Sequence, residues 1–145
     1  MPTGVGAPPL ISRDPVDLSR LVAAVEAPEI GGVATFTGLV RNHHQGRGVI
    51  GLEYSAYEPM AEQEMRAILA EAGTRWAVRL AATHRVGALS IGEVAVAIAA
   101  AGAHRGEAFD ACRYVIEEVK RRVPIWKRER YTDGTEAWVD PGSPG

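Results

Sequence analysis

The sequence predicts a single α+β domain, and three observations support this class. Apolar residues recur at helical spacing in three segments, and short β-rich segments lie between them. Turn-rich stretches join several of these short segments, which favours antiparallel pairing. The 145 residues, 46% of them hydrophobic, suffice for one compact core, and no internal repeat or interior linker divides the chain.

The chain is expected to begin with a flexible leader at residues 1–9, followed by a short strand at residues 10–12. Asp14 and Pro15 are typical of an N-cap followed by proline in the first helical turn. They predict a first helix, which Pro28 ends.

Two strands are predicted next, at residues 31–40 and 49–57, on either side of a polar, glycine-punctuated loop. We expect them to pair as a hairpin with a long, basic tip. A second helix opens at Glu58-Pro59, and Gly73 is a natural C-terminal cap for it.

The second half continues with strands at residues 76–84 and 94–98, separated by a turn-rich connector. A third helix begins near His104, and Pro124 bars its continuation. Residues 125–131 and 135–139 predict a hairpin that turns across Asp133-Gly134. The folded domain then spans residues 10–140, and residues 141–145 form a flexible tail.

The overall charge and the cysteine count limit the possible partners. A net charge of −2 does not support a general electrostatic attraction to nucleic acid or to a membrane surface. The single cysteine, Cys112, excludes an internal disulfide and fits a reducing compartment. Neither a signal peptide nor a membrane-spanning segment is indicated. We therefore expect a soluble, cytoplasmic protein.

The end of the third helix is the most informative stretch. Lys120 lies just before Pro124, and Lys127 lies just after it on the following strand. Lys120 borders the apolar face of the helix, so desolvation and the positive charges of Arg121, Arg122 and Lys127 should lower its pKa. A lysine with a lowered pKa can move protons near neutral pH. The alternative is a basic corner in solvent, where the lysine lays its stem along the surface.

A second positive cluster is predicted where a strand of small residues leads into the third helix. His104 and Arg105 fall in the first turn, where exposed N–H groups already favour an anion. Arg41, at the end of an earlier strand, would add a guanidinium that suits phosphate. Each of these side chains could instead point into solvent, which is the ordinary fate of a strand-end arginine.

Other candidates are weaker. His43 and His44 are adjacent, so on an extended chain their side chains point to opposite sides and do not suit one metal ion; no metal site is predicted. His84 is assigned to structure or to an interface, and Tyr54 and Cys112 to packing. Phe36 fits either a core or a platform for a flat heterocycle. From these residues alone, we predict a positively charged pocket for a phosphorylated small molecule or an acidic tail.

Several short motifs follow one another between about Gly31 and Val139: Phe36-Thr37-Gly38-Leu39-Val40-Arg41, Leu52-Glu53-Tyr54, Ala56-Tyr57, Met60-Ala61-Glu62, His84-Arg85-Val86-Gly87, Gly92-Glu93, Ala103-His104-Arg105 and Val123-Pro124-Ile125-Trp126-Lys127. In this order they resemble the large catalytic subunit of molybdopterin synthase, the MoaE family. Each motif alone is weak, whereas their number and order make the resemblance strong.

The resemblance implies a sulfurtransferase of molybdenum cofactor biosynthesis. Such enzymes convert cyclic pyranopterin monophosphate to molybdopterin, and their sulfur arrives as a thiocarboxylate on the Gly-Gly tail of a small ubiquitin-like carrier subunit. The implied assembly is a heterotetramer built on a homodimer of this chain. The implied fold is an α/β hammerhead with an additional antiparallel β subdomain. No cofactor is implied for this step.

The resemblance also implies roles for individual residues. Lys120 and Lys127 match the catalytic lysines of the family. Arg41, His104 and Arg105 match its anion-binding positions, and we add Phe36 as a substrate-binding residue. In the family, residues of both protomers contribute to one pocket, so the resemblance leaves open whether His104 and Arg105 act in their own chain or across the dimer interface. Two other classes of function stay open on the residues alone: an RNA-binding module that uses the basic run from Lys120 to Arg130 with Trp126, and a non-catalytic adaptor for a ubiquitin-like tail.

Overall fold

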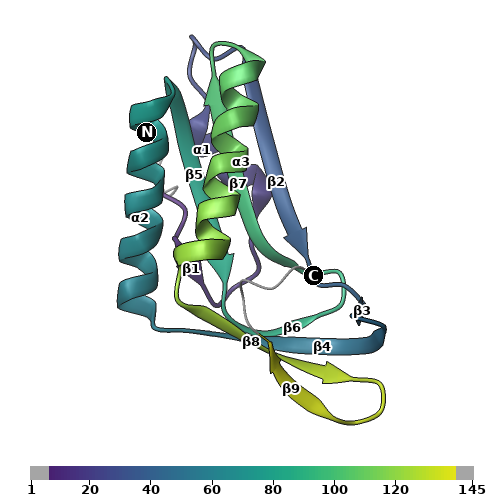
Figure 1. Cartoon of the computed structure of the whole chain (residues 1–145). Helices are drawn as coiled ribbons and strands as arrows, with labels where there is room; N and C mark the ends of the chain where they lie inside the picture. The colour runs from purple at the N-terminus through teal and green to yellow at the C-terminus, as the bar shows by residue number, and fades with distance from the viewer. Residues whose placement is uncertain (1–6, 140–145) are drawn as a thin grey trace.

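The computed structural model describes residues 7–139 and confirms the predicted α+β class. Its elements are β1 (Ile11–Ser12), α1 (Leu18–Val25), β2 (Gly32–Leu39), β3 (His43–His44), β4 (Arg47–Ala56), α2 (Glu58–Arg75), β5 (Val78–Arg85), β6 (Gly87–Ser90), β7 (Val94–Gly102), α3 (Arg105–Arg122), β8 (Ile125–Tyr131) and β9 (Glu136–Val139). The strands form two sheets, and the second lies across the lower end of the first (Figure 1). This arrangement agrees with a hammerhead-like body that carries an added antiparallel subdomain.

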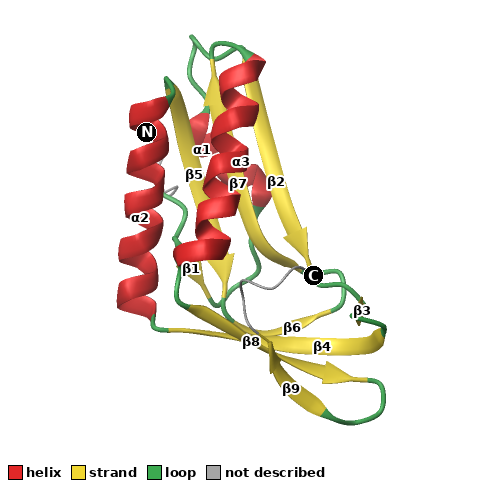
Figure 2. Ribbon diagram, viewed as in Figure 1, coloured by secondary structure: helices red, strands yellow, loops and turns green. Residues whose placement is uncertain are grey.

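The first sheet is the middle layer of a three-layer body. Its strand order is β1-β5-β7-β2, with β7 antiparallel to both β5 and β2, and with the short β1 parallel to β5. The long helices α2 and α3 cover one face, and α1 covers the other (Figure 2). Strand β2 is left as an edge of this sheet.

The central strand β7 consists mainly of small residues. Every residue from Ala95 to Gly102 is buried, as expected for a strand that helices cover on both faces. Ile98 and Ala100 join the core beneath α2 and α3. The alternate alanines pack against Leu21 and Val25 of α1 on the opposite face. Small side chains on β7 therefore let both helical layers come close to the sheet.

The second sheet is antiparallel, with strand order β3-β4-β8-β9 and with β6 paired to β4. Its terminal hairpin, β8 to β9, confirms the turn predicted at Asp133-Gly134, where Gly134 has a φ of 86°. Strand β8 lies between β4 and β9 and is hydrogen-bonded on both edges. Side chains on β8 are consequently held on a rigid element.

The predicted hairpin between residues 31–40 and 49–57 is wrong. Strand β2 pairs with β7, whereas β4 pairs with β3, β6 and β8 in the other sheet. The polar loop instead closes its own small hairpin, because Gln45 and Gly46 have φ values of 51° and 79° and join β3 to β4 in a two-residue turn. The loop thus redirects the chain from one sheet to the other.

Three smaller expectations also differ. Helix α1 begins at Leu18 rather than after Pro15, because the Asp17 carboxylate accepts a hydrogen bond from the Arg20 backbone N–H and provides the cap. Gly73 lies inside α2, which continues to Arg75. The predicted connector after β5 contains the strand β6, which pairs with β4.

Helix α3 stops where Pro124 was expected to stop it. Its last residue is Arg122, and β8 begins at Ile125. The Pro124 carbonyl accepts a hydrogen bond from the Tyr57 backbone N–H at 3.3 Å, which ties the corner to the start of α2. The chain direction therefore changes within two residues, between two elements that are both packed against neighbours.

The ends of the predicted domain are only partly described. Of the predicted leader, residues 1–6 lie outside the described residues, whereas the Pro9 carbonyl accepts a hydrogen bond from the Thr83 hydroxyl at 2.5 Å. The predicted tail at residues 141–145 also lies outside them. Among the described helices, none is long and apolar enough to cross a membrane.

Arg122 joins α3 to α2 through a cluster of carboxylates. Its guanidinium contacts Glu71 at 2.6 and 2.9 Å, Glu64 at 3.1 Å and Glu118 at 3.2 Å. Glu71 also accepts a hydrogen bond from the Tyr114 hydroxyl at 2.8 Å. The Arg122 guanidinium, helped by that hydroxyl, lowers the pKa of Glu71 to about 2. This cluster anchors the end of the helix that carries Lys120.

We predict that Glu71→Gln lowers the melting temperature at pH 7 but not near pH 2. The folded-state pKa of Glu71 lies below the ordinary value of 4.5, so its stabilising effect is complete above pH 4.5 and is lost as the pH falls toward 2. Thermal unfolding followed by circular dichroism across this range measures the difference. Glu117→Gln, at a largely exposed pair with Arg113, is the control. An equal loss at both pH values would contradict the assignment.

Candidate active site

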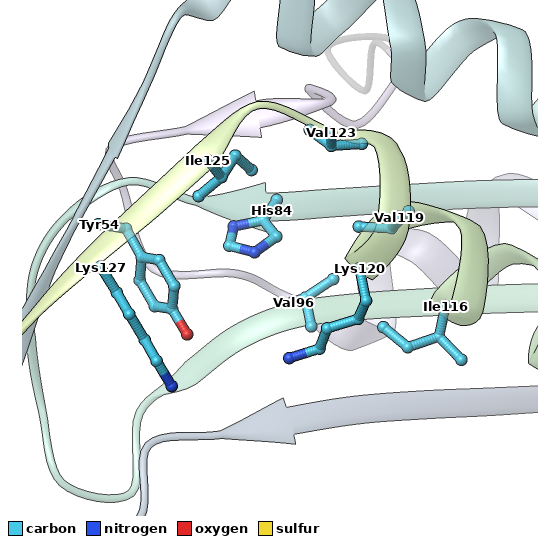
Figure 3. A pocket seen from close by; sticks show the side chains of 9 residues that line it. All are labelled: Tyr54, His84, Val96, Ile116, Val119, Lys120, Val123, Ile125 and Lys127. Atoms are coloured by element: carbon cyan, nitrogen blue, oxygen red, sulfur yellow. The ribbon is translucent and has the colours of Figure 1, made fainter. Parts of the chain in front are cut away.

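A pocket opens where α3 and β5 end above the second sheet, and we call it the lysine pocket. Its first part is lined by Tyr54, His84, Val96, Ile116, Val119, Lys120, Val123, Ile125 and Lys127 (Figure 3). An adjoining hollow shares both lysines and extends past the end of β2 to Gly38, Leu39, Val40, Arg41, His43, Leu52, Ala95 and Glu129. Both sheets and α3 therefore contribute to one site.

Lys120 and Lys127 reach the pocket from two different elements. Lys120 lies in the last turn of α3, and Lys127 lies on β8 directly opposite Tyr54 of β4. Figure 3 shows both side chains extending into the same space. The sharp corner at Pro124 thus brings together two amines that are seven positions apart in the sequence.

The pKa of Lys120 is lowered, as predicted, although not by all of the predicted neighbours. The Lys120 side chain is exposed to solvent on one side, but the surrounding protein removes part of the water around its amine. This desolvation is the largest cause of the lowered pKa. The positive charges of Lys127 and Arg41 lower the pKa further. Because Arg41 acts on Lys120, the strand-end arginine belongs to the same electrostatic site.

Arg121 and Arg122, by contrast, do not contribute to the pocket. Arg121 bonds Glu118 at 2.5 Å, and Arg122 bonds the α2 carboxylates described above. Both guanidinium groups therefore have acidic partners on the helical surface. The basic residues on the two sides of the corner thus separate: Arg121 and Arg122 form ion pairs on the helical surface, whereas Lys120 and Lys127 line the pocket.

A buried carboxylate beneath Lys127 was missed by the sequence analysis. Glu129 is only 3% exposed, and its carboxylate lies 3.6 Å from the Lys127 amine. It also contacts the His44 imidazole and accepts a hydrogen bond from the Tyr131 hydroxyl, each at 3.0 Å. The sequence could have revealed Glu129, because side chains alternate along a strand and Lys127, Glu129 and Tyr131 therefore share one face of β8.

His84 is also part of the pocket, although the sequence assigned it to structure or an interface. It is 7% exposed, and its Nδ1 lies 2.8 Å from the Arg85 carbonyl. A carbonyl only accepts, so Nδ1 carries the proton and Nε2 holds a lone pair. Burial, reinforced by the charge of Lys120, lowers the pKa of His84 to about 4. The imidazole is therefore neutral at pH 7.

His104, Arg105 and Phe36 lie elsewhere on this chain. Arg105 begins α3 and Lys120 is in its last turn, so about 22 Å of helix separates them. The His104 backbone N–H donates to the Glu107 carboxylate at 3.2 Å, which supplies the helix with a cap of its own. Phe36, on the edge strand β2, is 37% exposed. One copy of the chain does not bring these three residues to the lysine pocket.

The arrangement suits an anionic ligand. Lys120, Lys127 and Arg41 supply positive charge around one hollow, and apolar residues of α3 and β8 form part of its wall. An amine with a lowered pKa can both bind an anion and exchange a proton. Within residues 7–139, no group of histidine, cysteine and carboxylate side chains is placed to hold a metal ion.

We predict that Lys127→Gln and Arg41→Gln each raise the pKa of Lys120, because each removes a positive charge that now lowers it. The Lys127 variant should show the larger change, since Lys127 acts more strongly than Arg41. An NMR titration of the lysine side-chain carbons measures this pKa. Arg121→Gln, which removes a charge already paired with Glu118, should leave it unchanged. A Lys120 pKa equal in the wild type and in both pocket variants would refute the convergence of these charges.

Comparison with known proteins identifies the family. The family model described as MoaE protein matches residues 11–122. The molybdopterin synthase catalytic subunit of Bacillus subtilis is 45% identical over 130 residues, which cover 89% of this chain and 82% of that protein. Molybdopterin synthase catalytic subunit 1 of Mycobacterium tuberculosis is 43% identical over 130 residues, covering 89% and 88%.

A solved structure agrees with these relatives. The X-ray crystal structure of molybdopterin synthase from Staphylococcus aureus matches this fold with a TM-score of 0.85 and 36% sequence identity. The match covers 89% of this chain and 94% of that chain. Because the family model and the relatives span most of the described fold, the chain belongs to the MoaE family.

Proposed function

We propose that this chain is the catalytic subunit of a molybdopterin synthase. It converts cyclic pyranopterin monophosphate to molybdopterin with sulfur from the C-terminal thiocarboxylate of a small ubiquitin-like carrier. The observation that carries the proposal is the convergence of Lys120, Lys127 and Arg41 on one pocket, in a chain of the MoaE family. The substrate phosphate and the carrier tail are both anions, and the pocket offers the cations that they need.

Each pocket cation receives a role from its surroundings. Lys120 acts in proton transfer, because its lowered pKa keeps a larger neutral fraction than an ordinary lysine has. Lys127 remains beside the Glu129 carboxylate and polarises the thiocarboxylate carbonyl. Arg41 lines the adjoining hollow with an exposed side chain and binds the substrate phosphate. The reaction takes place in the cytoplasm, where the single cysteine would remain reduced.

The remaining substrate-binding residues come from a second copy of the chain. Strand β2 is an edge of its sheet and exposes Val33, Phe36 and Leu39, an apolar edge of the kind that a partner covers. Helix α3 packs beside β2, so His104 and Arg105 lie near the same side of the molecule. A homodimer through this side brings His104, Arg105 and Phe36 to the pocket of the partner, and one carrier binds each end.

We predict that Lys120→Ala reduces dithiolene formation by about 100-fold or more, because it removes a group that exchanges protons in the reaction. The assay contains purified chain, thiocarboxylated carrier and cyclic pyranopterin monophosphate, and it follows product by chromatography. Carrier binding and thermal stability should stay near wild type. Arg121→Ala, one position along and paired at the surface, is the matched control. Turnover of Lys120→Ala within a few-fold of wild type would contradict the catalytic role of Lys120.

Mixed dimers test the contribution of the second protomer. Lys120→Ala and Arg105→Ala dimers should each be inactive, because each lacks one part of every site. After subunit exchange in a 1:1 mixture, about half of the dimers contain one copy of each variant. One of the two sites in such a mixed dimer has both residues, so the mixture should recover about a quarter of wild-type activity. If Arg105 served the pocket of its own chain, no site would be complete and no activity would return.

A further inference from the structure

The hydroxyl of Tyr54 reaches the same space as the two amines of the lysine pocket. Tyr54 on β4 is directly opposite Lys127 on β8, so the two side chains leave the same face of the second sheet. Figure 3 shows the ring beside Lys127, with its hydroxyl directed into the pocket toward the space between the Lys127 and Lys120 amines. The pocket therefore holds an uncharged donor as well as two cations.

The Tyr54 ring is held in place from several sides. It meets the His84 imidazole edge to face, with ring centroids 5.0 Å apart and an interplanar angle of 81°. His84 is itself fixed by its hydrogen bond to the Arg85 carbonyl. Strand β4 is paired with β6 on one edge and with β8 on the other at this residue. A donor that is held this firmly needs little reorganisation when charge develops beside it.

The Tyr54 hydroxyl is not used within the described fold. Among residues 7–139, no hydrogen bond involves it, and no fully buried side-chain oxygen or nitrogen lacks a partner. The oxygen is therefore open to the pocket rather than sealed in the core. Burial, together with the negative charge of Glu129, raises the pKa of Tyr54 to about 12. At neutral pH the hydroxyl keeps its proton and is available to donate it.

We propose that Tyr54 is a further catalytic residue, whose hydroxyl donates a hydrogen bond to the acyl oxygen of the carrier tail while the acyl carbon–sulfur bond breaks. This inference rests on the proposed function. Sulfur leaves a thiocarboxylate only when that bond is cleaved, and water is the nucleophile that cleaves it. Negative charge then forms on the acyl oxygen, and the Tyr54 hydroxyl stabilises this charge by donating a hydrogen bond.

The step is balanced without an oxidant or a reductant. Once the thiocarboxylate sulfur has bonded to the substrate carbon and displaced an oxygen substituent, which leaves with its electron pair as water or as a phosphate oxygen, the carrier and substrate are joined as an S-acyl ester. Water adds to the acyl carbon, and the carbonyl electron pair moves to oxygen. When that pair returns, the carbon–sulfur bond breaks and sulfur keeps its electrons as a thiolate on the substrate. The carrier leaves as a carboxylate, and the two protons of water pass through a pocket amine to solvent.

The uncharged Tyr54 hydroxyl stabilises the transition state of cleavage without strengthening the binding of every anion that enters the pocket. Besides their roles in proton transfer and carbonyl polarisation, the charged amines attract the thiocarboxylate, the substrate phosphate and the product alike, so part of their effect is on binding. A hydrogen bond from Tyr54 strengthens mainly as charge gathers on the acyl oxygen, which happens only during cleavage. Its removal should therefore slow this step and leave substrate affinity almost unchanged.

The test is a single-turnover reaction with the Tyr54→Phe variant, which keeps the ring and its contact with His84. Product formation should slow by about 100-fold, with KM unchanged, as when an oxyanion donor is removed. The S-acyl adduct of carrier and substrate should accumulate and be detected by intact-protein mass spectrometry. Tyr114→Phe, which removes a hydroxyl bonded to Glu71 on the helical face, is the matched control and should react like wild type.

Turnover of Tyr54→Phe within about twofold of wild type would overturn the proposal. So would a loss confined to KM with no accumulating adduct, because a binding role alone predicts that pattern. Failure of the proposed function gives a different result, since the wild-type chain itself would then form no dithiolene product from the thiocarboxylated carrier.

Discussion

The site depends on holding two ammonium groups close together against their mutual repulsion. Flexible side chains on one surface would separate, because each charge is better solvated alone. Here Lys120 and Lys127 come from separate elements, each anchored elsewhere: α3 is joined to α2 through Arg122, and β8 is paired on both edges. The corner at Pro124 sets their relative position. Rigid packing outside the pocket thus maintains an unfavourable arrangement inside it.

The buried Glu129 makes this arrangement tolerable and also makes the two lysines unequal. Its carboxylate lies beside Lys127, and the His44 and Tyr131 side chains contact the same carboxylate. A buried carboxylate needs such partners, since an unpaired one is costly. Lys127 therefore has a fixed counter-charge, whereas Lys120 meets mainly positive neighbours and has the lowered pKa. One amine is suited to hold an anion, and the other is suited to exchange protons.

The sequence predicts features that depend on local signals, such as the helix stop at Pro124, the turn at Gly134 and the two lysines that flank the corner. The pairing of β2 and β4 was wrong because a two-residue turn at Gln45 closes a different hairpin, and sheet membership depends on distant strands. His84 was undervalued for a similar reason. Nothing near it in the sequence shows that β5 ends against α3 and β4. Glu129 could have been found, because strand alternation places it on the face of Lys127.

The proposed function requires this pocket to take sulfur from a carrier thiocarboxylate and to place it on a phosphorylated pterin. A reconstituted single-turnover reaction with purified chain, thiocarboxylated carrier and cyclic pyranopterin monophosphate tests it most directly. We expect dithiolene product, with one thiocarboxylate converted to carboxylate for each sulfur gained, and no product when the carrier ends in an ordinary carboxylate. A chain that binds the thiocarboxylated carrier and leaves both the thiocarboxylate and the pterin unchanged would contradict it.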